Sequence, residues 1–286
     1  MRNLAFAAFL GLVACGGKGP ADYSAVESAA TSDSKAQMKI EEGDALWAER
    51  GDADKLASAL AVYEEAVSLD PDNRHAYERL VRGWYFYGDG HTDDVDTKVE
   101  RWGVAIEWGA RCMALNDGFK AKIDAGEKEK DAVIAASKDD VPCLYWLSSA
   151  LGKWGKAQSL SKTLKHLPTV KAYMSKCEEL DPTYNNYGPA RYWGAYYSAL
   201  PSFAGRDFEK SGEYFEASIQ GAPDYLGTRV LRAEMLAVGT GDEAMFDSDL
   251  AFVLEADPNA VEGFEAENAK EQEKARALIE QKNELF

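Results

Sequence analysis

Aromatic and cationic side chains that could bind a small molecule are concentrated in two helical segments of the second half of the chain. Large aromatic side chains on a concave wall provide contact area at little cost in conformational entropy, and lysine or arginine can bind a carboxylate there. The alternative is that the aromatics are core residues and the charges are solvated. The candidate ligand- or partner-binding residues are Tyr145, Trp146, Lys153, Trp154, Arg191, Tyr192, Trp193, Tyr196 and Tyr197.

The spacing of the second group assigns its aromatics to two helix faces. Tyr192 and Tyr196 are four residues apart and share one face, as do Trp193 and Tyr197. We expect one of these faces in the core and the other along a groove.

Other reactive side chains form no recognisable catalytic or metal-binding pattern. In the loop 89–100, acids at 89, 93 and 100 match a calcium-binding loop, but His91 replaces an expected Asp or Asn and Asp94 an expected glycine. We therefore interpret it as a solvated acidic loop. The histidines are far apart, and the HExxH, GxSxG and phosphate-loop patterns are missing. We expect no catalytic residue, no metal and no cofactor, and predict that the protein is not an enzyme.

The composition is that of an acidic globular protein. The 286 residues carry a formal net charge of −17, and 46% of them are hydrophobic, which is enough to bury a core. Nucleic-acid binding needs clustered lysine and arginine, so this balance argues against a nucleic-acid partner. After the first 15 residues, no segment approaches the roughly 18 apolar residues of a membrane span.

The first 15 residues have the pattern of a secretory signal. Arg2 is followed by an apolar run over 4–13 and then by Ala14-Cys15. A cysteine directly after the small residue resembles a bacterial lipobox, which implies acylation of Cys15 and cleavage before it. The alternative is a plain signal peptide that contains a cysteine. Gly16 stands where an inner-membrane retention signal would place Asp, so the resemblance favours the outer membrane, facing the periplasm.

These features predict the organisation of the N-terminal region. We expect a lipoprotein signal peptide over 1–14, then the lipidated cysteine and a flexible tether over 15–34, because that segment is small, polar and without periodicity. The chain would contact the membrane through the lipid anchor only, since two or three buried acyl chains anchor stably.

Amphipathic helical segments recur along the rest of the chain. Four of them end at a proline, which cannot continue a helix: Pro71, Pro182, Pro223 and Pro258. The last three prolines are about 41 and 35 residues apart, a period typical of stacked helical hairpins.

Small and aromatic residues precede two of these prolines at equal offsets. Small residues allow neighbouring helices to approach, and the aromatic fills the groove between them. The offsets resemble those in the second helices of tetratricopeptide (TPR) repeats. They are occupied by Ala59, Tyr63, Ala66 and Pro71, and again by Ser211, Phe215, Ser218 and Pro223.

We therefore predict an all-α fold for 35–286, a TPR-like helical-hairpin solenoid (an α-α superhelix) of about 11–12 helices with a C-terminal capping helix. First helices are expected at about 35–50, 73–87, 141–157, 184–199 and 225–239. Second helices are expected at about 54–69, 97–115, 166–180, 207–220 and 243–256. An inserted helix is expected within 118–137, and a polar cap over 259–284.

Three cysteines remain beyond Cys15. Cys112 and Cys177 fall on the small-residue positions of second helices, where they are expected to be buried. An envelope location would permit a disulfide. If Cys143 is oxidised, Cys177 is its expected partner, because antiparallel helices bring those ends together.

A run of motifs in the second half resembles one known family. Tyr145-Trp146 and Leu151-Gly152-Lys153-Trp154 are followed by CEELDPTY (177–184), by Arg191-Tyr192-Trp193 and by ALPSFAGRDFEKSGEYFEASI (199–219). In order and spacing, these motifs resemble the T component (TatT) associated with tripartite ATP-independent periplasmic (TRAP) transporters. The resemblance is best over 141–258; the acidic loop at 88–96 and the extra segment at 116–140 depart from it.

The resemblance implies a lipoprotein accessory of a TRAP-type solute uptake system. Such a protein binds the periplasmic solute-binding (P) subunit, forms a homotrimer and contains a cavity for a small organic acid or an apolar ligand. The alternative is a TPR scaffold lipoprotein of an envelope assembly or secretion machine, which needs the same fold and tether but no ligand cavity.

Overall fold

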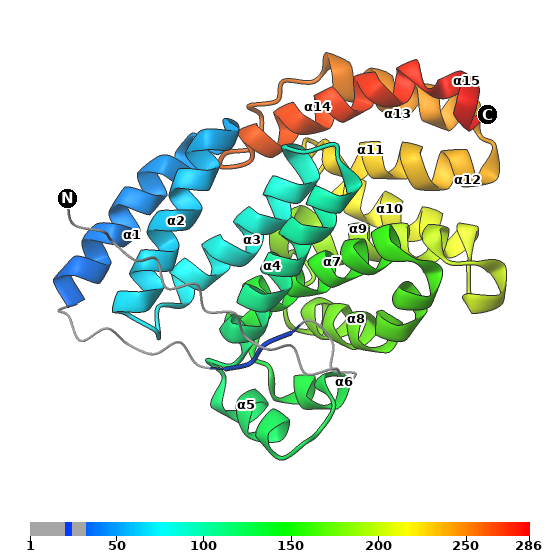
Figure 1. The fold of residues 1–286 in the computed structure, drawn as a ribbon. Helices are drawn as coiled ribbons and strands as arrows, with labels where there is room; N and C mark the ends of the chain where they lie inside the picture. Colours follow the sequence, from blue (N-terminus) through cyan, green and yellow to red (C-terminus); the bar gives the residue numbers. More distant parts are fainter. Residues whose placement is uncertain (1–20, 25–32) are drawn as a thin grey trace.

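The computed structural model describes residues 21–24 and 33–286; these are mainly helical, with all helices after residue 32, and contain no strand (Figure 1). The predicted signal peptide and Cys15 lie outside the described residues. Four hairpins follow one another: α1 (Asp33–Ala48) with α2 (Ala53–Leu69), α3 (Arg74–Gly90) with α4 (Val95–Met113), α7 (Val141–Gln158) with α8 (Leu160–Leu180), and α9 (Tyr184–Ala199) with α10 (Phe208–Gly221). A fifth pairs the interrupted helix α11 (Gly227–Arg232) and α12 (Val238–Thr240) with α13 (Glu243–Glu255), and α14 (Glu265–Glu280) and α15 (Lys282–Leu285) end the chain. The predicted all-α hairpin fold is confirmed.

The small and aromatic residues hold the hairpins together as predicted. Tyr63 and Phe215 are fully buried, and each ring lies against a glycine of the preceding helix. A Cβ atom on Gly43 would lie 2.7 Å from the Tyr63 ring, and one on Gly194 would lie 2.7 Å from the Phe215 ring. Only glycine allows this close approach, so the aromatic side chain determines how the two helices pack.

Side-chain caps begin several of these helices. The carboxylates of Asp52, Asp94 and Asp207 accept backbone N–H bonds at the starts of α2, α4 and α10. Ser159 does the same for α8, which therefore begins at Leu160 and not near 166 as predicted, with Pro168 inside the helix. Each cap satisfies a donor that the first turn leaves free.

The helix predicted over 184–199 is regular only from Gly188. Asn185, Asn186 and Tyr187 have φ values of 53°, 55° and 54°, a left-handed conformation that costs a non-glycine residue free energy. The Arg191 guanidinium binds the carbonyls of Asn185 and Asn186, which stabilises this turn. The helix predicted over 225–239 is interrupted as well, by a π-helical turn at Ala233–Ala237.

The predicted inserted helix is not a single helix. The segment forms α5 (Asp117–Asp124), α6 (Glu129–Ala132) and two 3-10 turns, η1 (Val133–Ala135) and η2 (Lys138–Asp140). Gly126, with φ of 84°, reverses the chain after α5. Helix-forming composition therefore predicted helicity here, but not the turn that breaks it.

The predicted cysteine pairing is wrong. Cys112 at the end of α4 is bonded to Cys143 at the start of α7, with 6.0 Å between their Cα atoms, and Cys177 is a free, buried thiol. α7 packs against α4 as well as against its own hairpin partner α8. The disulfide therefore joins consecutive hairpins and not the two helices of one hairpin.

The C-terminal helix α14 covers the last hairpin, as a cap does, but it also reaches the first two. Figure 1 shows α14 beginning near the turn between α1 and α2 and running along α13. Its Glu267 is buried and binds Arg50, in the α1–α2 turn, and Arg82, in α3. α14 thus connects the two ends of the hairpin array.

Residues 21–24, inside the segment expected to be a tether, lie against the body. The Tyr23 hydroxyl is 3.1 Å from the Tyr173 hydroxyl, and its ring centroid is 5.7 Å from that of Phe119. Asp22 forms an ion pair of 3.3 Å with Arg111. Across the described part of the chain, the structure has no helix with the length and apolar composition to cross a membrane.

Candidate functional site

A cavity of about 380 Å³ lies between the concave sides of the hairpins and α14. Four parts of the fold supply its inner wall: α3, α7, the first turns of α9 with α11, and α14. This volume falls in the range of small-molecule sites. Its charged and large aromatic residues are Arg82, Tyr85, Phe86, Asp89, Asp93, Lys98, Tyr145, Trp146, Lys153, Arg191, Tyr225, Glu234, Glu267, Glu271 and Lys274.

Four of the candidate residues from the sequence meet in this cavity. Tyr145 and Trp146 of α7 pack edge to face with ring centroids 5.0 Å apart. The Tyr145 hydroxyl accepts a hydrogen bond of 3.2 Å from Arg191 of α9, and Lys153 lies two turns further along α7. The structure therefore brings one aromatic pair and two cations to the same wall.

The other five candidates lie elsewhere. Trp154 packs against His166 of α8, and Tyr192 lies beside Gly152 of α7. Trp193 is buried and donates its indole N–H to Glu178. The remaining two, together with a tyrosine of α10, form a half-buried outer cluster: Tyr196, Tyr197 and Tyr214. Neither aromatic face of α9 lines the cavity.

A half-buried group of charges lies at one end of the cavity. Asp89 of α3 binds both Lys153 of α7 and Lys274 of α14, and Lys274 also binds Glu271 at 2.8 Å. Burial alone would raise the pKa of Asp89, but the two ammonium groups outweigh burial and lower it below its usual value. Asp89 is therefore ionised, and it joins three helices that are distant in sequence.

A second charged group lies where α14 meets the first hairpins. Glu267 binds Arg50 at 2.6 Å and Arg82 at 2.7 Å, and all three residues are at most 8% exposed. Burial opposes ionisation of Glu267, but the two guanidinium groups lower its pKa below the usual value. Two positive charges share one negative charge here, so the group carries a net positive charge.

Arg191 has no acidic partner among the described residues. It is 7% exposed, its guanidinium donates to two backbone carbonyls and to Tyr145, and it lies 4.3 Å from the centre of the Tyr225 ring. A buried charge that is compensated only by dipoles and a ring face makes the surrounding space attractive to an anion.

Two tyrosine hydroxyls in the cavity wall are available to a ligand. Within the described residues, no hydrogen-bond partner is found for the hydroxyl of Tyr85 or of Tyr225. Burial raises the pKa of both, so both stay protonated and can donate. Both hydroxyls lie in the same lining as Arg191, a cation without an acidic partner among the described residues. Across the whole lining, five cationic and five acidic side chains balance, so the local attraction for an anion comes from Arg191 and these hydroxyls.

The acids of the 89–100 loop have other roles. Asp89 belongs to the lysine cluster just described, and the Asp94 carboxylate accepts the Thr97 N–H at the start of α4. Within residues 21–24 and 33–286, no group of three or more His, Cys, Asp or Glu side chains is placed to hold a metal ion.

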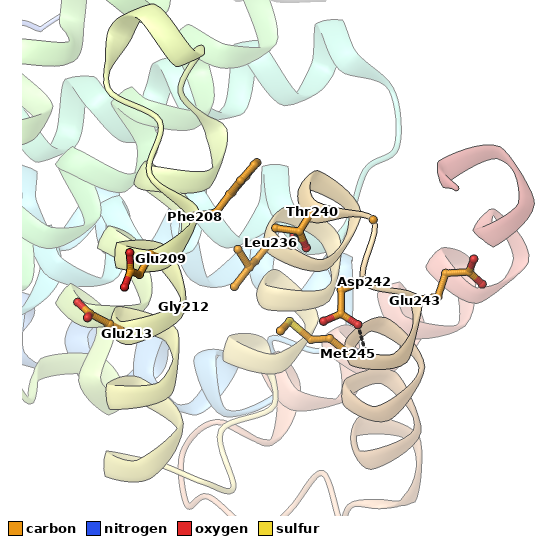
Figure 2. A pocket seen from close by; sticks show the side chains of 10 residues that line it. Phe208, Glu209, Gly212, Glu213, Leu236, Thr240, Asp242, Glu243 and Met245 are labelled. Atoms are coloured by element: carbon orange, nitrogen blue, oxygen red, sulfur yellow. Dashed lines mark hydrogen bonds between the residues drawn. The ribbon is translucent and has the colours of Figure 1, made fainter.

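A second hollow lies on the outside of the molecule. Figure 2 shows an open groove between the start of α10 and the turn that leads into α13. Its apolar floor is formed by Phe208, Leu236 and Met245, and its polar rim is acidic. Asp242 in this rim caps α13 through the Met245 N–H. The groove is open to solvent and cannot enclose a ligand as the inner cavity can.

Sequence reasoning missed the cavity residues of α3 and α14. Arg82, Tyr85 and Asp89 are spaced by three and four residues and share one helix face. Glu267, Glu271 and Lys274 follow the same rule. A polar or aromatic stripe on an otherwise core-packed helix is the signal that could have identified the first set.

The model of the family described as TAtT, TRAP transporter T-component, matches residues 53–286. No curated protein is significantly similar to the chain.

Proposed function

The chain belongs to the TRAP transporter T-component family, and on that premise we propose that it binds the periplasmic solute-binding subunit of a TRAP-type uptake system. The family match over 53–286 carries this proposal. The family is one of transporter components and not of enzymes, and it favours the transport role over the scaffold role.

The location follows from the same premise together with the N-terminal sequence. A TRAP component belongs to the cell envelope, and we propose that acylated Cys15 holds the protein at the outer membrane, facing the periplasm. Intact-mass measurement of protein purified from its native membrane tests the acylation. A chain that begins at Cys15 and carries diacylglycerol and an N-acyl group is expected.

We propose that the cavity binds a small organic acid, not a purely apolar ligand. Its walls carry tyrosine hydroxyls and buried ions, which an apolar ligand would leave unsatisfied. A carboxylate near Arg191 could accept hydrogen bonds from Tyr85 and Tyr225, and it would supply the acidic partner that Arg191 lacks among the described residues.

Calorimetric titration with short mono- and dicarboxylates, from propionate to adipate, tests the cavity proposal. Tyr225→Phe removes one free hydroxyl but keeps the ring beside Arg191, so affinity should fall about five- to tenfold. Tyr214→Phe, on the outer cluster, is the matched control and should bind as the unchanged protein does. Equal affinities for the two variants would exclude the cavity as the binding site.

For the solute-binding subunit we propose a docking surface on α9 and α10. The outer cluster of Tyr196, Tyr197 and Tyr214 is half-buried. Phe203, in the connection between α9 and α10, is 77% exposed. Aromatic side chains of this kind supply much of the binding free energy in protein interfaces.

A pull-down tests partner binding directly. The solute-binding protein encoded beside the chain is immobilised, and retention of the chain at micromolar concentration is measured. Tyr196→Ala with Phe203→Ser should weaken retention at least about tenfold, whereas Ile279→Ser, an exposed apolar position on α14, should not. Absence of a complex with the unchanged chain would contradict the proposal. Light scattering of the same sample tests the homotrimer that the family resemblance implies.

A further inference from the structure

The segment 141–177 has a charge opposite to that of the whole chain. It contains six lysines and no aspartate or glutamate, although the chain has a net charge of −17. Lys153 binds Asp89 in the cavity, and Lys176 binds Glu179. The remaining lysines lie on the surface of the α7–α8 hairpin.

The tip of this hairpin is both basic and apolar. Leu160, the first residue of α8, is 51% exposed. Three exposed lysines surround it in sequence, and none forms an ion pair with an acid in the described part of the chain: Lys156, Lys162 and Lys165. An apolar side chain flanked by unpaired lysines suits the headgroup region of an anionic membrane.

The N-terminal segment enters the fold beside the same helix. Ala21 and Tyr23 lie in a groove that His166, Thr169 and Tyr173 of α8 help to form. On a helical projection, Lys162 and Lys165 lie on the side of α8 that faces this groove. Figure 1 shows the described N-terminal residues near α5 and α6, below α7.

The chain length limits how far an anchor on Cys15 can be from α8. Ala21 is the sixth residue after Cys15, so their Cα atoms can be at most about 22 Å apart. Along α8, Leu160 is about 9 Å from His166 at 1.5 Å per residue. An acyl chain on Cys15 would therefore hold this part of the body at the membrane surface.

We propose that the α7–α8 tip rests on an anionic phospholipid surface and sets the orientation of the body on the membrane. This inference rests on the acylation of Cys15 within the proposed function, but not on the solute-binding subunit. Each lysine near such a surface favours contact about fivefold. Tyr23 contributes as a positioning residue, because it holds the short connection against α8.

Lysine labelling of the full acylated chain tests this proposal. The protein is placed in phosphatidylethanolamine–phosphatidylglycerol vesicles, in phosphatidylcholine vesicles and in neutral detergent. It is then acetylated briefly and mapped by mass spectrometry. In the anionic vesicles, labelling of Lys156, Lys162 and Lys165 relative to Lys55 should fall at least about fivefold compared with detergent. Lys55, at the start of α2, is the internal control: its side chain is 45% exposed and forms an ion pair of 3.4 Å with Glu49.

Two further arms make the result decisive. In phosphatidylcholine vesicles, or at high salt, most of the protection should disappear, because the attraction is electrostatic. Tyr23→Ala should reduce protection in the anionic vesicles by freeing the N-terminal segment. Equal labelling in all three environments would overturn the proposal, as would protection that appears only after the solute-binding subunit is added. Neither outcome would affect the pull-down.

Discussion

Replacing Glu267 with Gln tests whether the ion pairs between α14 and the first two hairpins stabilise the fold. The glutamine keeps the shape of the side chain but removes the one carboxylate that is found bound to Arg50 and Arg82 among the described residues. Arg50 is 3% exposed and Arg82 is 8% exposed, so water cannot readily replace the lost partner. Breaking a buried pair in this way typically costs about 3–5 kcal/mol.

Equilibrium unfolding in guanidinium chloride measures the loss of folding free energy. The free energy of unfolding of the Glu267→Gln variant should be lower by about 3–5 kcal/mol, with a lower midpoint and an unchanged slope. Glu280→Gln is the matched control on the same helix. Glu280 is exposed, and no ion pair is found for it within the described residues. Its replacement should change the free energy by less than about 0.5 kcal/mol.

The pH dependence provides an independent check. The pKa of Glu267 in the folded protein is below its usual value of 4.5, so its contribution is fully present above that pH. The contribution is lost as the pH falls through the folded pKa. The difference between the original protein and Glu267→Gln should therefore shrink on acidification. Equal midpoints at pH 7, or a difference that stays constant down to pH 3, would refute the reasoning.

Three other changes have defined outcomes. Reduction of the Cys112–Cys143 bond, which spans 31 residues, should lower the free energy of unfolding by about 3–4 kcal/mol, and a non-reducing peptide map should find Cys177 as a thiol. Asp89→Asn should cost about 2 kcal/mol in denaturant unfolding, since it leaves two lysines facing each other, one of them more than a third exposed. Its loss of stability should be smaller in acid, because Asp89 contributes only while ionised. Gly188→Ala should lower the melting temperature, because its Cβ would lie 2.6 Å from the Tyr145 hydroxyl.

The hairpins could be predicted because their determinants are local. Ala59, Tyr63 and Ala66 lie on one face of one helix, and Pro71 ends that region, so a short window contains the whole pattern. Their burial in the structure follows directly from this spacing. The left-handed turn at 185–187 could not be predicted in the same way, since it depends on Arg191 and on contacts with α10.

The cavity was predicted in part, because helix faces are known from sequence but their neighbours are not. Tyr145, Trp146 and Lys153 of α7 line the cavity. On α9, Asn185 and Arg191 are the residues that line the cavity. The aromatics further along the helix pack against neighbouring helices or the outer cluster instead. Periodicity identified the two aromatic faces of α9. It could not predict that the cavity is lined only by residues nearer the start of this helix.

The C-terminal helix shows why charge alone does not identify an exposed segment. Its composition predicts a solvated cap, yet Glu267 binds Arg50, which is 217 residues away in sequence. A solenoid end needs polar residues facing water, and a cavity wall that binds an anion needs polar residues facing inward. The two demands select the same amino acids. They differ in the residues that pair with these charges, and for Glu267 and Lys274 of α14 those residues lie in the α1–α2 turn and on α3. The contact between α14 and the first hairpins therefore cannot be predicted from the sequence of α14 alone; it requires the three-dimensional arrangement of the hairpins.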